Sequence, residues 1–436
     1  MMSLAASLPP VTGLAAAPGM PPGPTAAHFD DRETRPATER EEELMARLPH
    51  LIRSAKVAKG WAWLLSGTDA RSVTSREALA RLPVLRRADL AGMQAGRPPF
   101  GGLVPEPVTA FKRVFASPGG FYAPEAAAHD AWLAARALFA AGLRKGDIVV
   151  NCQSYHLAPA GFVIDSGCRA LGCPVVPAGP STNDAELDER IAIIEHLAPV
   201  ALAGTAERIS KLLHRAAQIG RDVSSLRIAL IGDGPIDAQT RAELAGKGIE
   251  TFTTMTTAEL GVIAYETSAH DGFVLNEGFI AEIVHPGTGD PVEPGDAGEL
   301  VITTFDPHSP FVRLGTGMIS AQLPGTDASG RTNTRLAGWL CTADQAARVG
   351  EKTVTPAQIA QLRRRHPGLG RLRLTLSGKG GKETAVLSAE TRDTTPDLQK
   401  SLAATLLDVA RIAGQVELVA GRRLPNDGRV IADERR

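Results

Sequence analysis

The chain has 436 residues, which is too long for one compact core and predicts a large domain with a smaller one. Apolar residues make up 43% of it and charged residues 22%, as in ordinary globular proteins. The formal net charge of −1 gives no reason to expect nucleic acid or a membrane surface as a partner, and no apolar run is long enough to span a bilayer.

Residues 1–38 are predicted to form a flexible tail, because residues 1–27 consist mainly of Ala, Pro and Gly. This stretch lacks the basic start and unbroken apolar run of a secretory signal. The four cysteines fit neither a disulfide scaffold nor a common zinc spacing. We therefore expect a reducing, cytoplasmic location.

Strand and helix patterns follow one another along residues 39–231. An amphipathic helix that Pro49 interrupts is expected at 39–55, and a strand at 111–115 precedes a helix at 129–142. Further strands are expected at 147–152, 174–177, 200–203 and 227–231, with helices at 158–171, 184–197 and 206–217. This alternation predicts a doubly wound parallel sheet, whose ligands bind beyond the carboxyl ends of its strands.

After residue 248 the pattern becomes β-rich, with strands expected at 251–257, 279–284 and 299–304. A small α+β unit follows, with helices at 356–366 and 396–412 and strands at 371–377, 384–389 and 415–419. The predicted fold is therefore α/β. A large domain over 39–341 combines the doubly wound sheet with a β-rich subdomain, and a small α+β domain covers 342–436.

Residues 303–339 carry the most informative pattern. Glycine-rich turns lie between β-type runs here, with Arg313 and Arg335 on either side, which suits close approach of backbone to a phosphorylated ribose. The segment Arg313-Leu-Gly-Thr-Gly-Met318 resembles the Arg-x-Gly-Thr-Gly-Asp turn of the phenylacetate-CoA ligase family of adenylate-forming enzymes. The resemblance continues, in order, from about Glu39 to the end of the chain.

This resemblance implies a reaction in two halves. A carboxylate attacks the α-phosphate of ATP, giving acyl-AMP and pyrophosphate, and the thiol of coenzyme A then displaces AMP. ATP, Mg²⁺ and coenzyme A are therefore implied, together with a small-molecule carboxylic acid as substrate. The resemblance also implies a large nucleotide-binding domain, a hinge, a small mobile domain and a homodimer.

Several turns of the large domain correspond to the family's nucleotide site. Ser117, Gly119 and Gly120 stand in the phosphate loop, although a plain tight turn explains them equally well. Gly232-Asp233-Gly234 stands in the loop against adenine, where a glycine needed only for the turn is the alternative.

The segment Met255-Thr-Thr-Ala-Glu259 matches the family's phosphate and metal signature. The resemblance implies that Thr256 lies in the nucleotide site, that Thr257 binds the α-phosphate and that Glu259 holds Mg²⁺. Met255 stands where an aromatic residue stacks on adenine. Without the resemblance, Glu259 is only a solvated carboxylate at the start of a helix.

Other residues have counterparts in the family's acyl and mobile regions. Tyr155 and His156 border the expected substrate pocket, while local capping or packing is the alternative for the histidine. Arg335 corresponds to an arginine that contacts ribose or phosphate, and Asp344 to the hinge acid. Arg429 replaces a lysine that donates to the carboxylate and α-phosphate, and its alternative is a charged turn in a solvated tail.

Met318 and Arg429 are departures from the family, which has Asp and Lys at these positions. Two ribose hydroxyls would lose a charged acceptor at Met318, and each such hydrogen bond is worth about 1.5–3 kcal/mol. The sequence therefore leaves two functions open, an acyl- or aryl-CoA ligase and a catalytically impaired pseudoenzyme that binds nucleotide or acyl-CoA. The retained residues favour the ligase; they are Thr257, Glu259, Arg335 and Asp344.

Overall fold

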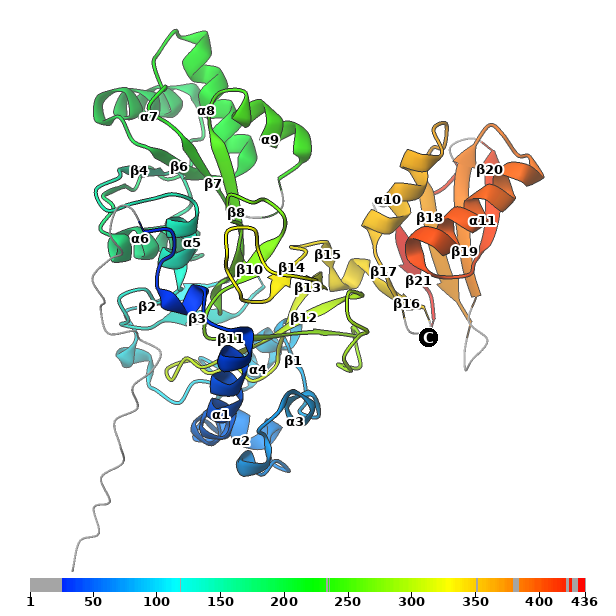
Figure 1. The fold of residues 1–436 in the computed structure, drawn as a ribbon, viewed down its shortest axis with the longest axis horizontal. Coiled ribbons are helices and arrows are strands. Elements are labelled where there is room, and N and C mark those ends of the chain that lie inside the picture. The colour runs from blue at the N-terminus through cyan, green and yellow to red at the C-terminus, as the bar shows by residue number, and fades with distance from the viewer. Residues whose placement is uncertain are drawn as a thin grey trace, which may run out of the picture.

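A computed structural model describes residues 26–435, except 118, 233, 235, 350–351, 379–383, 421–422 and 426–429. Within that part of the chain, a mixed sheet of 13 strands forms the large unit, and a separate four-stranded sheet forms the C-terminal unit (Figure 1). Along the large sheet the main strand order is β11-β12-β13-β14-β10-β9-β8-β7-β6-β4-β5. The predicted α/β fold class is confirmed.

One half of the large sheet is parallel. Its strands are β8 (Glu250–Thr257), β7 (Ile228–Ile231), β6 (Ala201–Gly204), β4 (Val149–Asn151) and β5 (Val175–Val176). The helices that cover it are α5 (Ala134–Ala140), α6 (Ala160–Leu171), α7 (Asp184–Leu197), α8 (Ala206–Gln218) and α9 (Ala238–Ala245). Val150 and Leu202 pack with α7 and α8, whereas Val149 and Ala201 pack with α5 and α6. Burial on both faces confirms the doubly wound prediction.

The other half of the sheet is mainly antiparallel. It contains β9 (Gly261–Tyr265), β10 (Phe273–Leu275), β11 (Phe279–Val284), β12 (Ala297–Thr304), β13 (Leu314–Leu323) and β14 (Arg335–Leu336), with β1 (Leu85–Arg86) and β15 (Cys341–Thr342) beside β13. The glycine-rich turn predicted at 315–317 is wrong, because these residues lie inside β13. A Cβ on Gly315 would lie 2.7 Å from the Glu299 carboxylate, so glycine lets the strand pass that side chain.

The N-terminal helices are α1 (Ala37–Ala55), α2 (Lys59–Leu64), α3 (Arg76–Ala80) and α4 (Leu90–Gly96). The predicted break at Pro49 is wrong, because α1 runs through it. Leu48 and Ile52 on this helix have 0% exposure. Their burial stabilises the helix and offsets the loss of the backbone hydrogen bond that proline cannot donate.

The flexible tail predicted through residue 38 is also wrong for its described part, residues 26–38. Glu33 is 2% exposed and accepts a hydrogen bond from the Tyr265 hydroxyl at 2.8 Å. The same carboxylate pairs with Arg331 at 3.1 Å and Arg136 at 3.3 Å. Phe29 packs edge-on against Phe139. These partners lie far away in the chain, so only the folded molecule shows that the segment is anchored.

The C-terminal unit has its own apolar core around Leu374, Leu387 and Leu402. A hairpin, β16 (Ala347–Val349) and β17 (Lys352–Val354), leads into it, followed by α10 (Pro356–Arg365), β18 (Leu372–Ser377), β19 (Thr384–Thr391), α11 (Pro396–Ala410), β20 (Gln415–Ala420) and β21 (Ile431–Asp433). Lys352 contacts Asp296 of the large unit at 2.6 Å. The domain boundary at residue 341 stays a prediction, supported by this separate core. Among the described helices, none has the length and apolarity to cross a membrane.

Candidate active site

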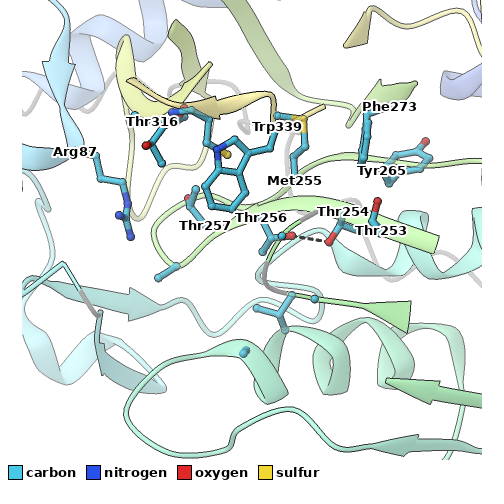
Figure 2. A pocket seen from close by; sticks show the side chains of 18 of the residues that line it. Arg87, Thr253, Thr254, Met255, Thr256, Thr257, Tyr265, Phe273, Thr316 and Trp339 are labelled. Atoms are coloured by element: carbon cyan, nitrogen blue, oxygen red, sulfur yellow. Dashed lines mark hydrogen bonds between the residues drawn. The ribbon is translucent and has the colours of Figure 1, made fainter. Parts of the chain in front are cut away.

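A cavity of about 1000 Å³ lies where the carboxyl ends of β7 and β8 meet residues 316–318 of β13 (Figure 2). This is the edge of a doubly wound sheet at which ligands are expected. One region of its wall is polar and contains arginine, threonine and glutamate side chains. Another region is apolar and comes mainly from α5, α6 and the strands beneath them, with Ala137, Leu138, Ala141, Val163, Ile164 and Phe252.

Arg87 is the anchored cation of the polar region. Its Nε donates to Glu259 Oε1 at 2.8 Å and its Nη2 donates to Ser117 Oγ at 3.1 Å. The guanidinium also lies over the Phe121 ring, 4.9 Å from the ring centre. Arg87 is 31% exposed and lines the cavity, so its remaining N–H groups can reach a ligand. The sequence did not indicate this role, because Arg87 is one of two adjacent arginines with no distinguishing spacing.

Glu259 lies behind Arg87, and its side chain is only 3% exposed. Burial raises the pKa of the Glu259 carboxyl, and the Arg87 charge opposes that rise. Within the described residues, no three or more His, Cys, Asp or Glu side chains gather into a metal site. Arg87 contacts only Oε1 of Glu259, and Oε2 is buried with no hydrogen-bond partner among the described residues. This oxygen fits one ligand position of a Mg²⁺ ion that is otherwise held by phosphate oxygens, and the ligand role of Glu259 stays a prediction.

The end of β8 supplies hydroxyl groups to the same cavity. Thr256 and Thr257 line it, and the Thr256 and Thr254 hydroxyls are hydrogen-bonded at 2.8 Å (Figure 2). Thr257 Oγ1 accepts the backbone N–H of Leu260 at 3.2 Å, which fixes the turn after the strand. Because that bond uses the oxygen as an acceptor, the Thr257 hydroxyl hydrogen can be donated to an acceptor, either the nearby Glu259 carboxylate or a ligand oxygen.

Trp339 brings an aromatic ring into the cavity. It is 37% exposed, and its Cζ3 lies 3.9 Å from the position that a Cβ on Gly234 would take. Figure 2 shows the indole in view with Met255 and Thr257, which line the same space. The sequence did not predict this exposed ring face. It offers a planar apolar surface that Met255 lacks.

Met318 lines the cavity and is 7% exposed. On the neighbouring strand β12, the Glu299 carboxylate also lines it and accepts the Gly317 N–H at 3.3 Å. Burial raises the pKa of the Glu299 carboxyl, opposed by Arg86, whose Nε lies 3.9 Å from Glu299 Oε2. The wall near residue 318 therefore includes a carboxylate that Met318 itself does not provide.

No protein-family model matches the chain. The chain is 28% identical over 337 residues to the phenylacetate-coenzyme A ligase of Aromatoleum evansii, covering 74% of this chain and 72% of that protein. It is 26% identical over 309 residues to the phenylacetate-coenzyme A ligase of Thermus thermophilus, covering 67% of each. The chain is a homologue of the phenylacetate-coenzyme A ligases.

The fold of the protein also matches solved structures. An open conformation of 2-hydroxyisobutyryl-CoA ligase, in complex with 2-HIB-AMP and CoA, aligns with a TM-score of 0.81 at 20% identity, covering 95% of this chain and 96% of that one. The postadenylation state of the same ligase aligns with a TM-score of 0.70. The protein therefore has the adenylate-forming CoA ligase fold, as its sequence predicted.

Most of the residues predicted for the nucleotide site line this cavity. They are Ser117, Gly119, Gly232, Gly234, Met255, Thr256, Thr257 and Met318. Gly120 does not line it and instead closes a tight turn, in which its N–H donates to the Ser117 carbonyl at 2.9 Å and its φ is +75°. β2 (Arg113–Ala116) and β3 (Tyr122–Glu125) flank this turn, and its role as a phosphate loop stays a prediction.

Arg335 does not line this cavity, and its contact with ribose or phosphate stays a prediction. Its Nη2 lies 2.8 Å from the Asp271 carboxylate, and its Nη1 donates to the Pro324 carbonyl at 2.9 Å. The short strand β14 directs this side chain to the loops beside it. The cationic side chains on the described cavity wall are instead Arg86 and Arg87.

The predicted substrate-pocket role of Tyr155 and His156 also stays a prediction. His156 is exposed, and neither residue lines the cavity. The Tyr155 hydroxyl accepts from Asn151 Nδ2 at 2.8 Å, so it serves the turn after β4. Gln153 in the same turn does line the cavity, and the sequence did not distinguish it.

The remaining predicted residues keep their status as predictions. Asp344 lies in the short helix η5 (Ala343–Gln345) between β15 and β16, where the chain passes between the two units, and its hinge role is not tested. Asp233 and Arg429 lie outside the described residues.

Proposed function

We propose that the protein is an ATP-dependent acyl- or aryl-CoA ligase that activates a carboxylic acid as acyl-AMP and transfers the acyl group to coenzyme A. The observation that carries this proposal is the convergence of the β7 and β8 turns, residues 316–318 and Arg87 on one cavity. The similarity to phenylacetate-coenzyme A ligases along most of the chain supports the same reaction.

In the first step, a carboxylate oxygen of the acid attacks the α-phosphorus of ATP, and the bond to pyrophosphate breaks. In the second step, the coenzyme A sulfur attacks the acyl carbon, AMP leaves with the bonding electron pair, and the thiol proton is released. Both steps shift negative charge on phosphate oxygens, so positioned donors on the cavity wall accelerate them.

Three side chains of the described wall fit the nucleotide. Arg87 is the cation for phosphate oxygens, because Glu259 and Ser117 hold it in place while its outer N–H groups stay accessible. Thr257 donates its hydroxyl to the α-phosphate. Trp339 provides the ring face for the base in place of an aromatic residue at Met255. Arg429 completes the proposal as the cation of the small domain.

Mg²⁺ enters this proposal as the magnesium complex of ATP, with phosphate oxygens as its main ligands. When bound, it neutralises charge on the triphosphate. The chain's own contribution is Arg87, which neutralises phosphate charge from the protein side.

A second candidate function is nucleotide or acyl-CoA binding without turnover. The observation that favours it is the Arg87–Glu259 ion pair, which occupies one of the two oxygens of the expected metal ligand. Met318 also favours binding without turnover, because a thioether offers ribose hydroxyls only a weak acceptor.

Incubation with magnesium-ATP, coenzyme A and a panel of aryl and short acyl acids separates these functions. A ligase releases pyrophosphate and AMP in equal amounts and forms a thioester that mass spectrometry detects. Reactions without acid or without coenzyme A are the controls. Nucleotide binding in calorimetry with no pyrophosphate from any acid would establish the pseudoenzyme, and absence of both would refute the two proposals together.

The proposal also covers the cellular location and the oligomeric state of the protein. We infer a reducing, cytoplasmic location, supported by four buried cysteines that form no disulfide. The homodimer implied by the family resemblance stays a prediction, which sedimentation velocity checks.

A further inference from the structure

Gln153 presents an unpartnered carboxamide to the cavity. The residue lies in the turn after β4, is 3% exposed, and lines the cavity wall. Its Oε1 is buried with no hydrogen-bond partner among the described residues. Buried amide groups in folded proteins are almost always hydrogen-bonded, so an unpaired one on a cavity wall points to a partner that enters the cavity.

The surrounding turn holds this carboxamide in place. The backbone N–H of Gln153 donates to Asn151 Oδ1 at 3.0 Å, and Asn151 Nδ2 donates to the Gly161 carbonyl at 2.9 Å and the Tyr155 hydroxyl at 2.8 Å. The Tyr155 ring then packs edge-on against Phe162 of α6, with ring centres 5.1 Å apart. The turn is therefore fixed by its own contacts, and the orientation of Gln153 does not depend on a ligand.

Gly232 makes the space that the carboxamide occupies. A Cβ at residue 232 would lie 2.2 Å from Gln153 Nε2, so the carboxamide would have to move away. The amide therefore lies across the end of β7, where only glycine leaves room. This contact joins the turn after β4 to the turn after β7.

The wall near Gln153 in the chain is apolar. Ala158, Pro159 and Ala160 line the cavity next, followed by Val163 and Ile164 of α6. Arg86 and Arg87, the cations of the described wall, come from the β1 region and serve the phosphate end. A ligand group beside Gln153 is therefore mostly apolar and carries one polar substituent that meets the amide.

We propose that Gln153 determines substrate specificity by accepting a hydrogen bond from a hydroxyl or amino substituent on an otherwise apolar aryl acid. This inference rests on the proposed ligase site and adds the class of acid to it. A site that hydrogen-bonds a substituent discriminates against the analogue that lacks it, because binding the analogue leaves the buried amide unpaired. We expect preferences of about 10- to 100-fold for the substituted member of a matched pair.

The test compares Gln153→Met with the unaltered protein on paired acids, such as benzoate with hydroxy- and aminobenzoates and phenylacetate with 4-hydroxyphenylacetate. Acid binding is measured by calorimetry in the presence of AMP, and thioester formation by mass spectrometry. The unaltered protein is expected to prefer at least one substituted acid, and Gln153→Met to lose that preference while binding the unsubstituted acid as well or better. Leu157→Ala is the matched control, because Leu157 lies in the same turn, is 61% exposed and does not line the cavity.

The direct binding measurement keeps this inference separate from the proposed function. A Gln153-dependent preference in binding without pyrophosphate release would retain the inference and refute the ligase. An unchanged preference in Gln153→Met, no preference in the unaltered protein, or no acid binding would overturn it. Equal loss of affinity for every acid and for ATP would assign Gln153 to the nucleotide and overturn it too. If Gln153→Met fails to fold, Gly232→Ala displaces the carboxamide instead and is expected to abolish the same preference.

Discussion

Replacing Arg87 by methionine leaves the Glu259 carboxylate, with its side chain 3% exposed, facing no cation. Removal of one partner of a buried ion pair costs about 3–5 kcal/mol, and the partial exposure of Arg87 places the expected loss near the lower end, about 3 kcal/mol. The double variant Arg87→Met/Glu259→Met removes both charges. Its free energy of unfolding is expected within about 1 kcal/mol of the unaltered protein, because apolar side chains replace a buried pair with little loss.

Urea denaturation at pH 7 and at lower pH measures these differences. Burial raises the pKa of the Glu259 carboxyl, and loss of the Arg87 charge raises it further. A folded-state pKa above the unfolded value favours the protonated folded form. The destabilisation by Arg87→Met is therefore full above the folded pKa and shrinks as the pH falls toward the unfolded value, about 4.3.

The reasoning would be refuted by an Arg87→Met variant as stable as the unaltered protein, or by a double variant no more stable than the single one. Nucleotide affinity provides an independent reading. Hydrogen bonds to a charged group are worth about 1.5–3 kcal/mol, so ATP affinity is expected to fall about 10- to 100-fold in Arg87→Met. The double variant regains stability but not this affinity, because the cation for the phosphates is still missing.

Three further predictions follow from the same structure. Met318→Asp is expected to raise ATP affinity about tenfold or more in calorimetry, because a carboxylate accepts ribose hydroxyls; an unchanged affinity would place residue 318 away from the ribose. Glu33→Gln is expected to lower the free energy of unfolding by about 2 kcal/mol, because two arginines lose their shared anion; an unchanged urea midpoint would contradict the anchoring role of residues 26–36. A thiol reagent at pH 8 is expected to react slowly with the folded protein, since burial raises the pKa of Cys152 and of Cys173 to about 11, and with all four cysteines after denaturation; fast reaction in the folded state would show that these thiols are accessible.

Elements with strong local patterns were predicted closely. The helix predicted at 184–197 is α7 (Asp184–Leu197), and the strand predicted at 279–284 is β11 (Phe279–Val284). The helix predicted at 129–142 is much shorter, because Asp130 accepts the N–H groups of Ala134 and Ala135 at 3.0 and 2.9 Å and starts α5 only there. A capping side chain several residues before the helix competes with helix propensity, and composition does not show which wins.

The residues of the candidate site also differ in how far the sequence predicted them. Thr256 and Thr257 were predicted because their segment resembles the phosphate and metal signature of the phenylacetate-CoA ligase family. Both lie at the end of a predicted strand, and strand ends in a doubly wound sheet meet at the ligand edge. Arg335 carries the expected charge, but β14 directs it to Asp271. Trp339 and Gln153 have no motif of their own, and their cavity positions depend on Gly234 and Gly232 from another strand end.

The sequence by itself determined the fold class, because hydrophobic periodicity and turn residues act over a few positions and are legible without the fold. Its resemblance to the phenylacetate-CoA ligase family indicated the kind of site to expect. The direction of each polar side chain was decided only by tertiary structure. Arg87 meets Glu259 across 172 positions of chain, and Glu33 meets Tyr265 across 232. Such pairings follow from which surfaces pack together, and packing is a property of the whole molecule.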